Sequence, residues 1–251
     1  MQAVAVIPTY NERDNIEELV EKIQRYAKDL HLLIVDDNSP DGTGKIAEEL
    51  KSKNPAKLFV LHREKKEGLG RAYVEGFRYV LKQGYQIIFQ MDADLSHDPA
   101  YLPLFLEQIR SCDLILGSRY LHGISVVNWD LKRLILSKMA TLYVRLITHM
   151  PFSDTTTGFK CWRREALESI GVEEAFSNGY LFQIEMTYKA YRKGANAVIH
   201  FAIHLTQLTI PTYYRVVAMG TAVRVSPRAS ESTSFTHPQT PGLDPADSPE
   251  S

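Results

Sequence analysis

Cysteine is scarce in this sequence of 251 residues. The two cysteines, Cys112 and Cys161, are too few for the disulfide framework that stabilises many small secreted proteins. The opening residues, MQAVAVIPTYNE, carry no basic segment before their apolar run, so they predict a first strand and not a signal peptide. We therefore expect a protein of a reducing compartment, which indicates a cytoplasmic location.

Long apolar runs and an excess of charge are missing too. No uninterrupted apolar stretch reaches the roughly 18 residues of a membrane-spanning helix, so any membrane contact is expected to be peripheral or through a partner. The formal net charge is -1, which disfavours a protein that binds nucleic acid by bulk electrostatic attraction. With 44% hydrophobic residues, the chain can still bury a sizeable core.

What the sequence does contain is a regular alternation of two patterns in its first half. Apolar runs of strand length are followed by segments whose apolar residues recur at helical spacing. This order is typical of an α/β protein with a doubly wound, mostly parallel sheet that is covered on both faces. The predicted strands are 3–8, 31–37, 57–62, 86–92 and 113–118, and the predicted helices are 14–28, 43–53, 70–82 and 99–110.

The second half is organised differently. The segment 131–148 predicts an apolar helix that also carries lysine and arginine. It is either a helix that lies on an anionic membrane surface or a core helix whose cations reach solvent. Further predicted elements are a strand at 157–162 and a helix at 179–193. Proline, serine and threonine then dominate, and we predict a disordered tail over 226–251.

Polar clusters follow three of the predicted strands. PTYNE follows the first, DDNSPDGT the second and DADLS the fourth. Because ligands of open parallel sheets bind beyond the carboxyl ends of the strands, we expect these clusters to contribute to one site. The first cluster has no glycine and the sequence has no G-x-x-x-x-G-K-[ST] motif. These absences disfavour a dinucleotide-binding dehydrogenase and a P-loop nucleotide-binding protein.

The pair Asp92 and Asp94 indicates a metal site. Two neighbouring carboxylates repel each other unless a cation lies between or beside them, and oxygen ligands alone suit Mg²⁺ or Mn²⁺. Such an ion takes substrate phosphates among its remaining ligands, so the pair suggests a nucleotide diphosphate. The alternative is a loop in which one aspartate caps the next helix, although Asp98, before Pro99, is better placed for that role.

Taken together, the motifs resemble glycosyltransferase family 2, and most closely its polyprenol (dolichol) phosphate mannosyltransferases. They are PTYNE, VDDNSPDGT, EKKEGLGRAY, MDADLSHDP, GSRY, WDLKR and TTGFKCWRREAL, which cover about residues 3–194 in order. The resemblance implies a GT-A fold with a Rossmann-like nucleotide-binding half. It also implies metal-dependent, inverting transfer of mannose from GDP-mannose to a polyprenyl (dolichyl) phosphate at the cytoplasmic face of a membrane.

The resemblance implies roles for individual residues as well. Asp92 and Asp94 would bind the metal on the diphosphate, and Asp94, Arg119 and Arg133 would be the catalytic residues. Both arginines would meet the acceptor phosphate, because a guanidinium pairs bidentately with phosphate oxygens. A phosphate acceptor is already an anion, so no general base is required. The residues implied to bind the sugar nucleotide are Pro8, Tyr10, Glu12, Val35, Asp37, Asp92, Ala93, Asp94, Ser96 and Arg119.

The likeness to the family stops after Gly194. We expect a transferase domain over 1–194, made of a nucleotide-sugar half (1–118) and an acceptor half (119–194). Residues 195–225 would replace the family's terminal strand and loop, and they lack its arginine and lysine.

A missing terminal strand should expose apolar surface on the preceding helix, near Phe182, Tyr188 and Tyr191. The abrupt change into the Pro/Ser/Thr-rich tail suggests the hypothesis of a reading-frame change. Two alternatives to the mannosyltransferase stay open. One is a related enzyme that uses another sugar nucleotide, such as UDP-glucose. The other is a nucleotide-sugar-binding domain whose catalysis is crippled by the missing cations.

Overall fold

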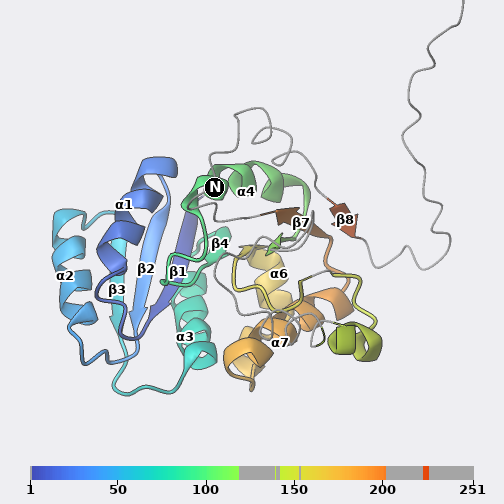
Figure 1. The fold of residues 1–251 in the computed structure, drawn as a ribbon. Coiled ribbons are helices and arrows are strands. Elements are labelled where there is room, and N and C mark those ends of the chain that lie inside the picture. The colour runs from blue at the N-terminus through green and yellow to red at the C-terminus, as the bar shows by residue number, and fades with distance from the viewer. Residues whose placement is uncertain (1, 119–138, 140–141, 153, 202–222, 226–251) are drawn as a thin grey trace, which may run out of the picture.

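The structure, a computed structural model, describes residues 2–118, 139, 142–152, 154–201 and 223–225 (Figure 1). Within this part of the chain the strands form one sheet, in the order β3-β2-β1-β4-β6-β5-β7-β8. The strands are β1 (Ala3–Thr9), β2 (His31–Asp36), β3 (Leu58–His62), β4 (Ile87–Gln90), β5 (Leu114–Ser118), β6 (Lys160–Arg163), β7 (Ala197–Phe201) and β8 (Val223–Val225). The helices are α1 (Ile16–Tyr26), α2 (Thr43–Lys53), α3 (Leu69–Lys82), α4 (Leu102–Gln108), α6 (Arg164–Ser169) and α7 (Gly179–Arg192), with short 3-10 turns at Pro99–Tyr101, Ile109–Ser111 and Val172–Glu174.

The sheet is parallel in its first half and mixed in its second. Strands β3, β2, β1 and β4 pair in parallel, as expected for strands joined by crossover helices. Strand β6 runs antiparallel between β4 and β5, and β7 is again parallel to β5. The predicted α/β architecture is therefore confirmed. The antiparallel insertion of β6 brings the predicted strand at 157–162 into the centre of the sheet.

Helices cover both faces of the sheet, and each face has its own core (Figure 1). Alternate residues of β1 enter the two cores: Ala5 and Ile7 pack with α1, α2 and α4, whereas Val4 and Val6 pack with α3, α6 and α7. The strands are therefore apolar on both sides, which explains their continuous apolar runs.

The expected loss of the terminal strand is wrong. Strand β7 follows Gly194 closely and pairs with β5 from Leu114↔Ala197 to Ser118↔Phe201. Phe182 is fully buried, and Tyr188 and Tyr191 are partly buried against the core that contains α3 and α7. Backbone pairing tolerates many side chains, so a strand can form where the family motif is absent. The predicted tail at 226–251 lies outside the described residues.

The described part of the predicted helix at 131–148 is helical over 142–148. Its apolar side chains are largely exposed: 57% for Leu142, 66% for Tyr143, 66% for Leu146 and 61% for Ile147. This stretch is thus not a core helix, and residues 131–138 lie outside the described residues. Among the described helices, none combines the length and apolar character needed to cross a bilayer.

Helix α3 approaches the sheet closely at Gly76. A Cβ added there would lie 2.5 Å from Val6 Cγ1 and 3.0 Å from Val35 Cγ2. We predict that Gly76→Ala lowers the free energy of unfolding by about 1–3 kcal/mol, because the helix must move away from β1 and β2. Urea unfolding measures this loss. Lys82→Ala, on the exposed end of α3, is the control, and equal stability of the two variants would contradict the close approach.

Candidate functional site

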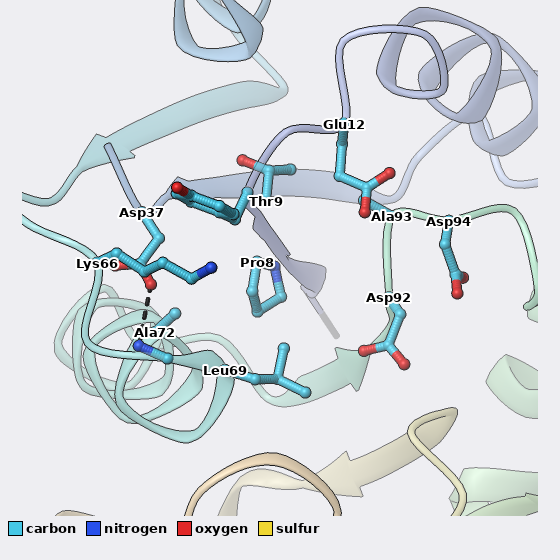
Figure 2. A pocket seen from close by; sticks show the side chains of 12 residues that line it. Pro8, Thr9, Glu12, Asp37, Lys66, Leu69, Ala72, Asp92, Ala93 and Asp94 are labelled. Carbon is cyan, nitrogen blue, oxygen red and sulfur yellow. Dashed lines mark hydrogen bonds between the residues drawn. The ribbon is translucent and has the colours of Figure 1, made fainter. Parts of the chain in front are cut away.

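A cavity of about 310 Å³ opens at the carboxyl ends of β1 and β4 (Figure 2). This is the edge of the sheet where the polar clusters were expected to meet. Figure 2 shows Glu12, Asp92 and Asp94 toward one end of the cavity and Asp37 and Lys66 at the other. The lining residues are Pro8, Thr9, Tyr10, Glu12, Asp37, Lys66, Gly68, Leu69, Ala72, Asp92, Ala93 and Asp94.

Asp92 follows β4 and is held on several sides. The Tyr73 hydroxyl donates to Asp92 Oδ1 at 2.7 Å, and the backbone N–H of Asp92 donates to His97 Nδ1 at 3.0 Å. A Cβ at Gly158 would lie 2.5 Å from Asp92 Oδ2. A larger residue in place of the glycine of the TTGF motif would therefore displace this carboxylate or the loop that approaches it.

Asp94 is exposed, whereas Asp92 is only partly exposed. The backbone N–H of Ser96 donates to Asp94 Oδ1 at 3.1 Å. Leu95, between them, has a φ of 61°, in the left-handed region that residues other than glycine seldom adopt. This turn folds the DADLS segment back on itself and presents Asp94 to the cavity. Backbone strain of this kind often accompanies functional sites.

Glu12 adds a third carboxylate to the cavity. Asn15 Nδ2 donates to Glu12 Oε2 at 2.7 Å, and the Glu12 backbone N–H donates to Thr43 Oγ1 at 3.0 Å. The pKa of Glu12 is raised by burial first, and then by the charges of Asp94 and Asp92, although the Asn15 hydrogen bond opposes the shift. Three carboxylates, Glu12, Asp92 and Asp94, therefore line the same cavity.

The donor atoms fit a hard divalent ion. Asp92 and Asp94 offer carboxylate oxygens, which Mg²⁺ and Mn²⁺ prefer. Across the described ranges, no group of three or more His, Cys, Asp or Glu side chains forms a complete metal site. An ion here would therefore complete its coordination with water and with oxygens of a bound diphosphate, as Mg²⁺ typically does.

Asp37 lines the cavity but already has several donors. It forms an ion pair with the buried Arg63, and the backbone N–H groups of Gly68 and Glu67 donate to it at 3.1 Å and 3.4 Å. Arg63 also pairs with Glu67 at 2.7 Å and Glu75 at 3.1 Å. In this arrangement Asp37 holds the glycine-containing loop in place at the cavity wall.

The same loop is joined to helix α7 by Asn178. Asn178 Oδ1 accepts from the Gly70 N–H at 2.8 Å, and its Nδ2 donates to the Glu67 carbonyl at 2.8 Å. Gly68 has a φ of 96°, and a Cβ there would lie 2.2 Å from Asn178 Nδ2. The glycines of EGLGRAY thus serve a close packing contact with α7. Asn178 was not singled out from the sequence, because nothing in its neighbourhood marks it as a partner of this loop.

Tyr10 and Lys66 both line the cavity, and Lys66 Nζ lies 3.5 Å from the centroid of the Tyr10 ring. This is the distance of a cation–π contact. Thr9 and Lys66 are lining residues that the motifs did not single out, although Lys66 belongs to EKKEGLGRAY. The Thr9 hydroxyl donates to Asp36 Oδ1 at 3.2 Å, and Lys66 places a positive charge at the end of the cavity away from Asp92 and Asp94 (Figure 2).

Of the remaining predicted site residues, some line the cavity, some lie away from it, and some lie outside the described residues. Pro8 and Ala93 line the cavity, as their motifs suggested. Val35 is fully buried in the core against α3, and Ser96 contributes its backbone N–H to Asp94 without lining the cavity. Arg119 and Arg133 lie outside the described residues.

The sequence is similar to a known family and to characterised proteins. The model of Glycosyl transferase family 2 matches residues 4–171. The polyprenol monophosphomannose synthase of Mycolicibacterium smegmatis is 42% identical over 198 residues, which cover 78% of this chain and 75% of that protein. The undecaprenyl-phosphate mannosyltransferase of Micrococcus luteus is 39% identical over 198 residues, 79% of this chain and 81% of that protein.

Solved structures of glucosyl-3-phosphoglycerate synthase from Mycobacterium tuberculosis share the fold. The complex with Mn²⁺, uridine-diphosphate-glucose and phosphoglyceric acid matches with a TM-score of 0.56 and 18% identity over 76% of this chain, and the chain spans only 65% of that protein. The complex with uridine-diphosphate matches with a TM-score of 0.58 and 17% identity, over 85% of this chain and 74% of that protein. At these identities the likeness concerns the fold alone.

A buried lysine lies behind the acidic residues. Lys160, on β6, is fully buried and donates from Nζ to the carbonyl oxygen and to Oε1 of Gln183, both at 2.9 Å. Burial lowers its pKa to about 7, although the charges of Asp92 and Asp154 act in the opposite direction. A neutral lysine is therefore favoured in the folded protein above that pH, whereas the unfolded chain keeps this lysine protonated up to its ordinary pKa.

We predict that Lys160 makes stability rise with pH. Between about pH 7 and pH 10.5 the unfolded state binds the proton more strongly than the folded state, so raising the pH through this window increases the free energy of unfolding. Urea unfolding near both ends of the window, compared with Lys160→Met, measures the effect. The free energy of unfolding of wild type minus that of Lys160→Met should rise with pH. The same difference for the exposed Lys193→Met should not change with pH. A flat difference for Lys160→Met would contradict the depressed pKa.

Proposed function

The chain belongs to glycosyltransferase family 2, and from this membership we propose that it transfers mannose from GDP-mannose to a polyprenyl phosphate. The chain is a glycosyltransferase, and the expected GT-A fold is present. One observation carries the choice of sugar and acceptor. The relatives at 42% and 39% identity are named a polyprenol monophosphomannose synthase and an undecaprenyl-phosphate mannosyltransferase.

The cavity supports this proposal on the donor side. The nucleoside would lie between Pro8 and Tyr10 at one end, and the diphosphate near Asp92 and Asp94 at the other. Lys66 belongs to neither a helix nor a strand, and its Nζ over the Tyr10 ring places a positive charge at the cavity wall, where it could meet a phosphate. We propose that Asp37 acts here mainly through the loop it holds, since its oxygens already accept hydrogen bonds from Glu67 and Gly68.

A divalent ion bound by Asp92 and Asp94 would neutralise charge that develops on the leaving diphosphate. The chain's own residues then have two tasks. The aspartates orient the diphosphate relative to the sugar, and Arg119 and Arg133 bind the acceptor phosphate, as the family resemblance implies. Positioning of this kind is itself a large part of catalysis when the nucleophile is already charged.

The reaction needs no general base in the chain. An oxygen of the acceptor phosphate attacks the anomeric carbon as the bond from that carbon to the diphosphate oxygen breaks, and GDP leaves. Attack opposite the leaving group inverts an α-linked donor to a β-linked mannosyl phosphate. Glu185 of the FQIEM segment could be considered as a base for another acceptor, but its contacts are structural: its Oε2 accepts from the Ser177 N–H at 3.0 Å and its Oε1 pairs with Lys189 at 2.9 Å. That carboxylate has a structural role.

The lipid acceptor bears on where the enzyme works. We propose that it acts at the cytoplasmic face of a membrane, with residues 1–118 binding the sugar nucleotide and residues 119–194 binding the acceptor. The exposed Leu142, Tyr143 and Leu146 support membrane contact, since such side chains favour the interface of a bilayer.

A donor screen tests the function. The protein is incubated with Mn²⁺, a polyprenyl phosphate and radiolabelled GDP-mannose or UDP-glucose, and lipid-soluble label is counted. We expect label from GDP-mannose and none when the free polyprenol replaces its phosphate. Label from UDP-glucose alone would identify a related transferase with another donor. Binding of GDP without transfer from either donor would identify a binding domain with crippled catalysis.

Removal of one carboxylate should abolish the metal dependence of nucleotide binding. We predict that Asp94→Asn lowers the transfer rate by about 10²-fold or more, because charge on the leaving diphosphate is no longer balanced. Calorimetric titration of GDP with and without Mn²⁺ should lose its metal effect in Asp92→Asn and Asp94→Asn. Asp29→Asn is the control, because Asp29 is exposed and pairs only with Lys57 among the described ion pairs. A metal effect that survives in both site variants would refute the metal assignment.

Arg133 should matter for the acceptor and not for the donor. We predict that Arg133→Ala weakens use of the polyprenyl phosphate about tenfold or more, because charge-assisted hydrogen bonds to phosphate are lost. The Michaelis constants for acceptor and donor separate the two effects. Arg78→Ala, at the exposed pair with Glu173, is the matched control. An equal loss of GDP affinity in Arg133→Ala would place this arginine at the donor instead.

A further inference from the structure

We propose that Tyr73 is a positioning residue that sets the orientation of the Asp92 carboxylate for metal binding. The inference rests on the proposed function, because it assigns a role within the same site. Tyr73 is the last residue of the EKKEGLGRAY motif, but the family resemblance implied no role for it, and it does not line the cavity. Its hydroxyl reaches Asp92 Oδ1 from within the core, at 2.7 Å.

The ring of Tyr73 is fixed in place by aromatic neighbours. Tyr73 is fully buried, and its ring stacks on Phe77 of the same helix, with centroids 5.6 Å apart, and on Phe182 of α7, with centroids 5.7 Å apart and planes 3° from parallel. Such stacking stabilises one ring orientation beyond the burial of apolar area. The hydroxyl therefore points to one place, where Asp92 Oδ1 accepts its hydrogen bond.

The second neighbour of the carboxylate, His97, contributes less directly. Because the Asp92 N–H donates to His97 Nδ1, a neutral imidazole carries its proton on Nε2. That Nε2 lies 3.8 Å from Asp92 Oδ2, beyond the usual length of a hydrogen bond. The Tyr73 contact, at 2.7 Å, is the shorter of the two.

A hydrogen bond on one carboxylate oxygen fixes the plane of the whole group. The Gly158 backbone approaches the other oxygen, Oδ2, closely enough that a Cβ added at Gly158 would lie 2.5 Å from it. Between these two restraints the carboxylate of Asp92 has little freedom to rotate. Hydrogen bonds that orient a metal-binding side chain commonly contribute about 10- to 100-fold to metal affinity. The structure therefore assigns Tyr73 a share of the metal affinity although it does not itself bind the ion.

The stack also connects the two halves of the domain. Phe182 lies on α7, beyond the first half of the chain, and Asn178 of the same chain segment binds the loop that begins α3. Tyr73 is thus placed by contacts from both sides of the site. A change in the packing of α7 would reach Asp92 through the Phe182 and Tyr73 rings.

Tyr73→Phe tests the assignment, because it keeps the stacked ring and removes one O–H. Tyr85→Phe is the matched control: Tyr85 is 4% exposed, and its hydroxyl is 2.7 Å from His31 Nδ1, away from the cavity. The dissociation constant of Mn²⁺ is measured from the electron paramagnetic resonance signal of free Mn²⁺, in the presence of saturating GDP. We expect it to rise about 10- to 100-fold in Tyr73→Phe and to stay unchanged in Tyr85→Phe.

Kinetics provide a second readout that a purely structural role would not change. The Mn²⁺ concentration for half-maximal transfer should rise in Tyr73→Phe, and activity should recover at high Mn²⁺. If Tyr73→Phe fails to fold, Phe182→Leu decides, since it keeps the hydroxyl but removes one side of the stack. A higher Mn²⁺ dissociation constant in that variant supports the role, and an unchanged one overturns it.

The outcomes for the inference and for the function are separate. If wild type binds Mn²⁺ with GDP and transfers mannose, while Tyr73→Phe binds Mn²⁺ equally tightly, the role of Tyr73 is overturned and the function stands. If wild type with GDP does not bind Mn²⁺, the metal-dependent function fails, and the role of Tyr73 fails with it.

Discussion

The repulsion between carboxylates at the end of β4 is the constraint on which the rest of the site depends. Asp92 and Asp94 lie one residue apart, and the pKa of Glu12 is raised by its burial first and then by the charges of these two aspartates. A protein keeps such a cluster only if the fold holds it in place and a cation balances it. Parallel strands provide the first condition, because they bring their carboxyl ends to one edge of the sheet. A metal-bound sugar diphosphate would provide the second.

Close packing of backbone is the way the fold holds these groups. Gly158 lets its loop approach Asp92, Gly70 lets the start of α3 approach the chain before α7, and Gly76 lets α3 approach β1. In each case a Cβ would lie 2.5 Å from another atom. Gly70 and Gly158 therefore contribute to the shape of the cavity without lining it, whereas Gly68 of the same GLG motif lines it directly.

The sequence predicted the elements with a strong periodicity and the residues that stand at strand ends. The parallel half of the sheet, Asp92 and Asp94 belong to this group, because a buried strand followed by carboxylates is a local pattern. Asn178 could not be found this way, and neither could the role of Tyr73 at the end of EKKEGLGRAY, since their hydrogen-bond partners are distant in the chain. Strand β7 was missed because the family motif was absent, whereas pairing with β5 depends on backbone groups that every sequence supplies.

The central claim is that Asp92 and Asp94 hold a divalent ion against the diphosphate of a sugar nucleotide. Diffraction from crystals of the protein grown with Mn²⁺ and GDP, recorded at the manganese absorption edge, tests it most directly. The account predicts an anomalous peak within bonding distance of an Asp94 oxygen and a diphosphate oxygen, inside the cavity that Tyr10 and Glu12 line. GDP bound in this cavity without such a peak, or a peak remote from both aspartates, would contradict it.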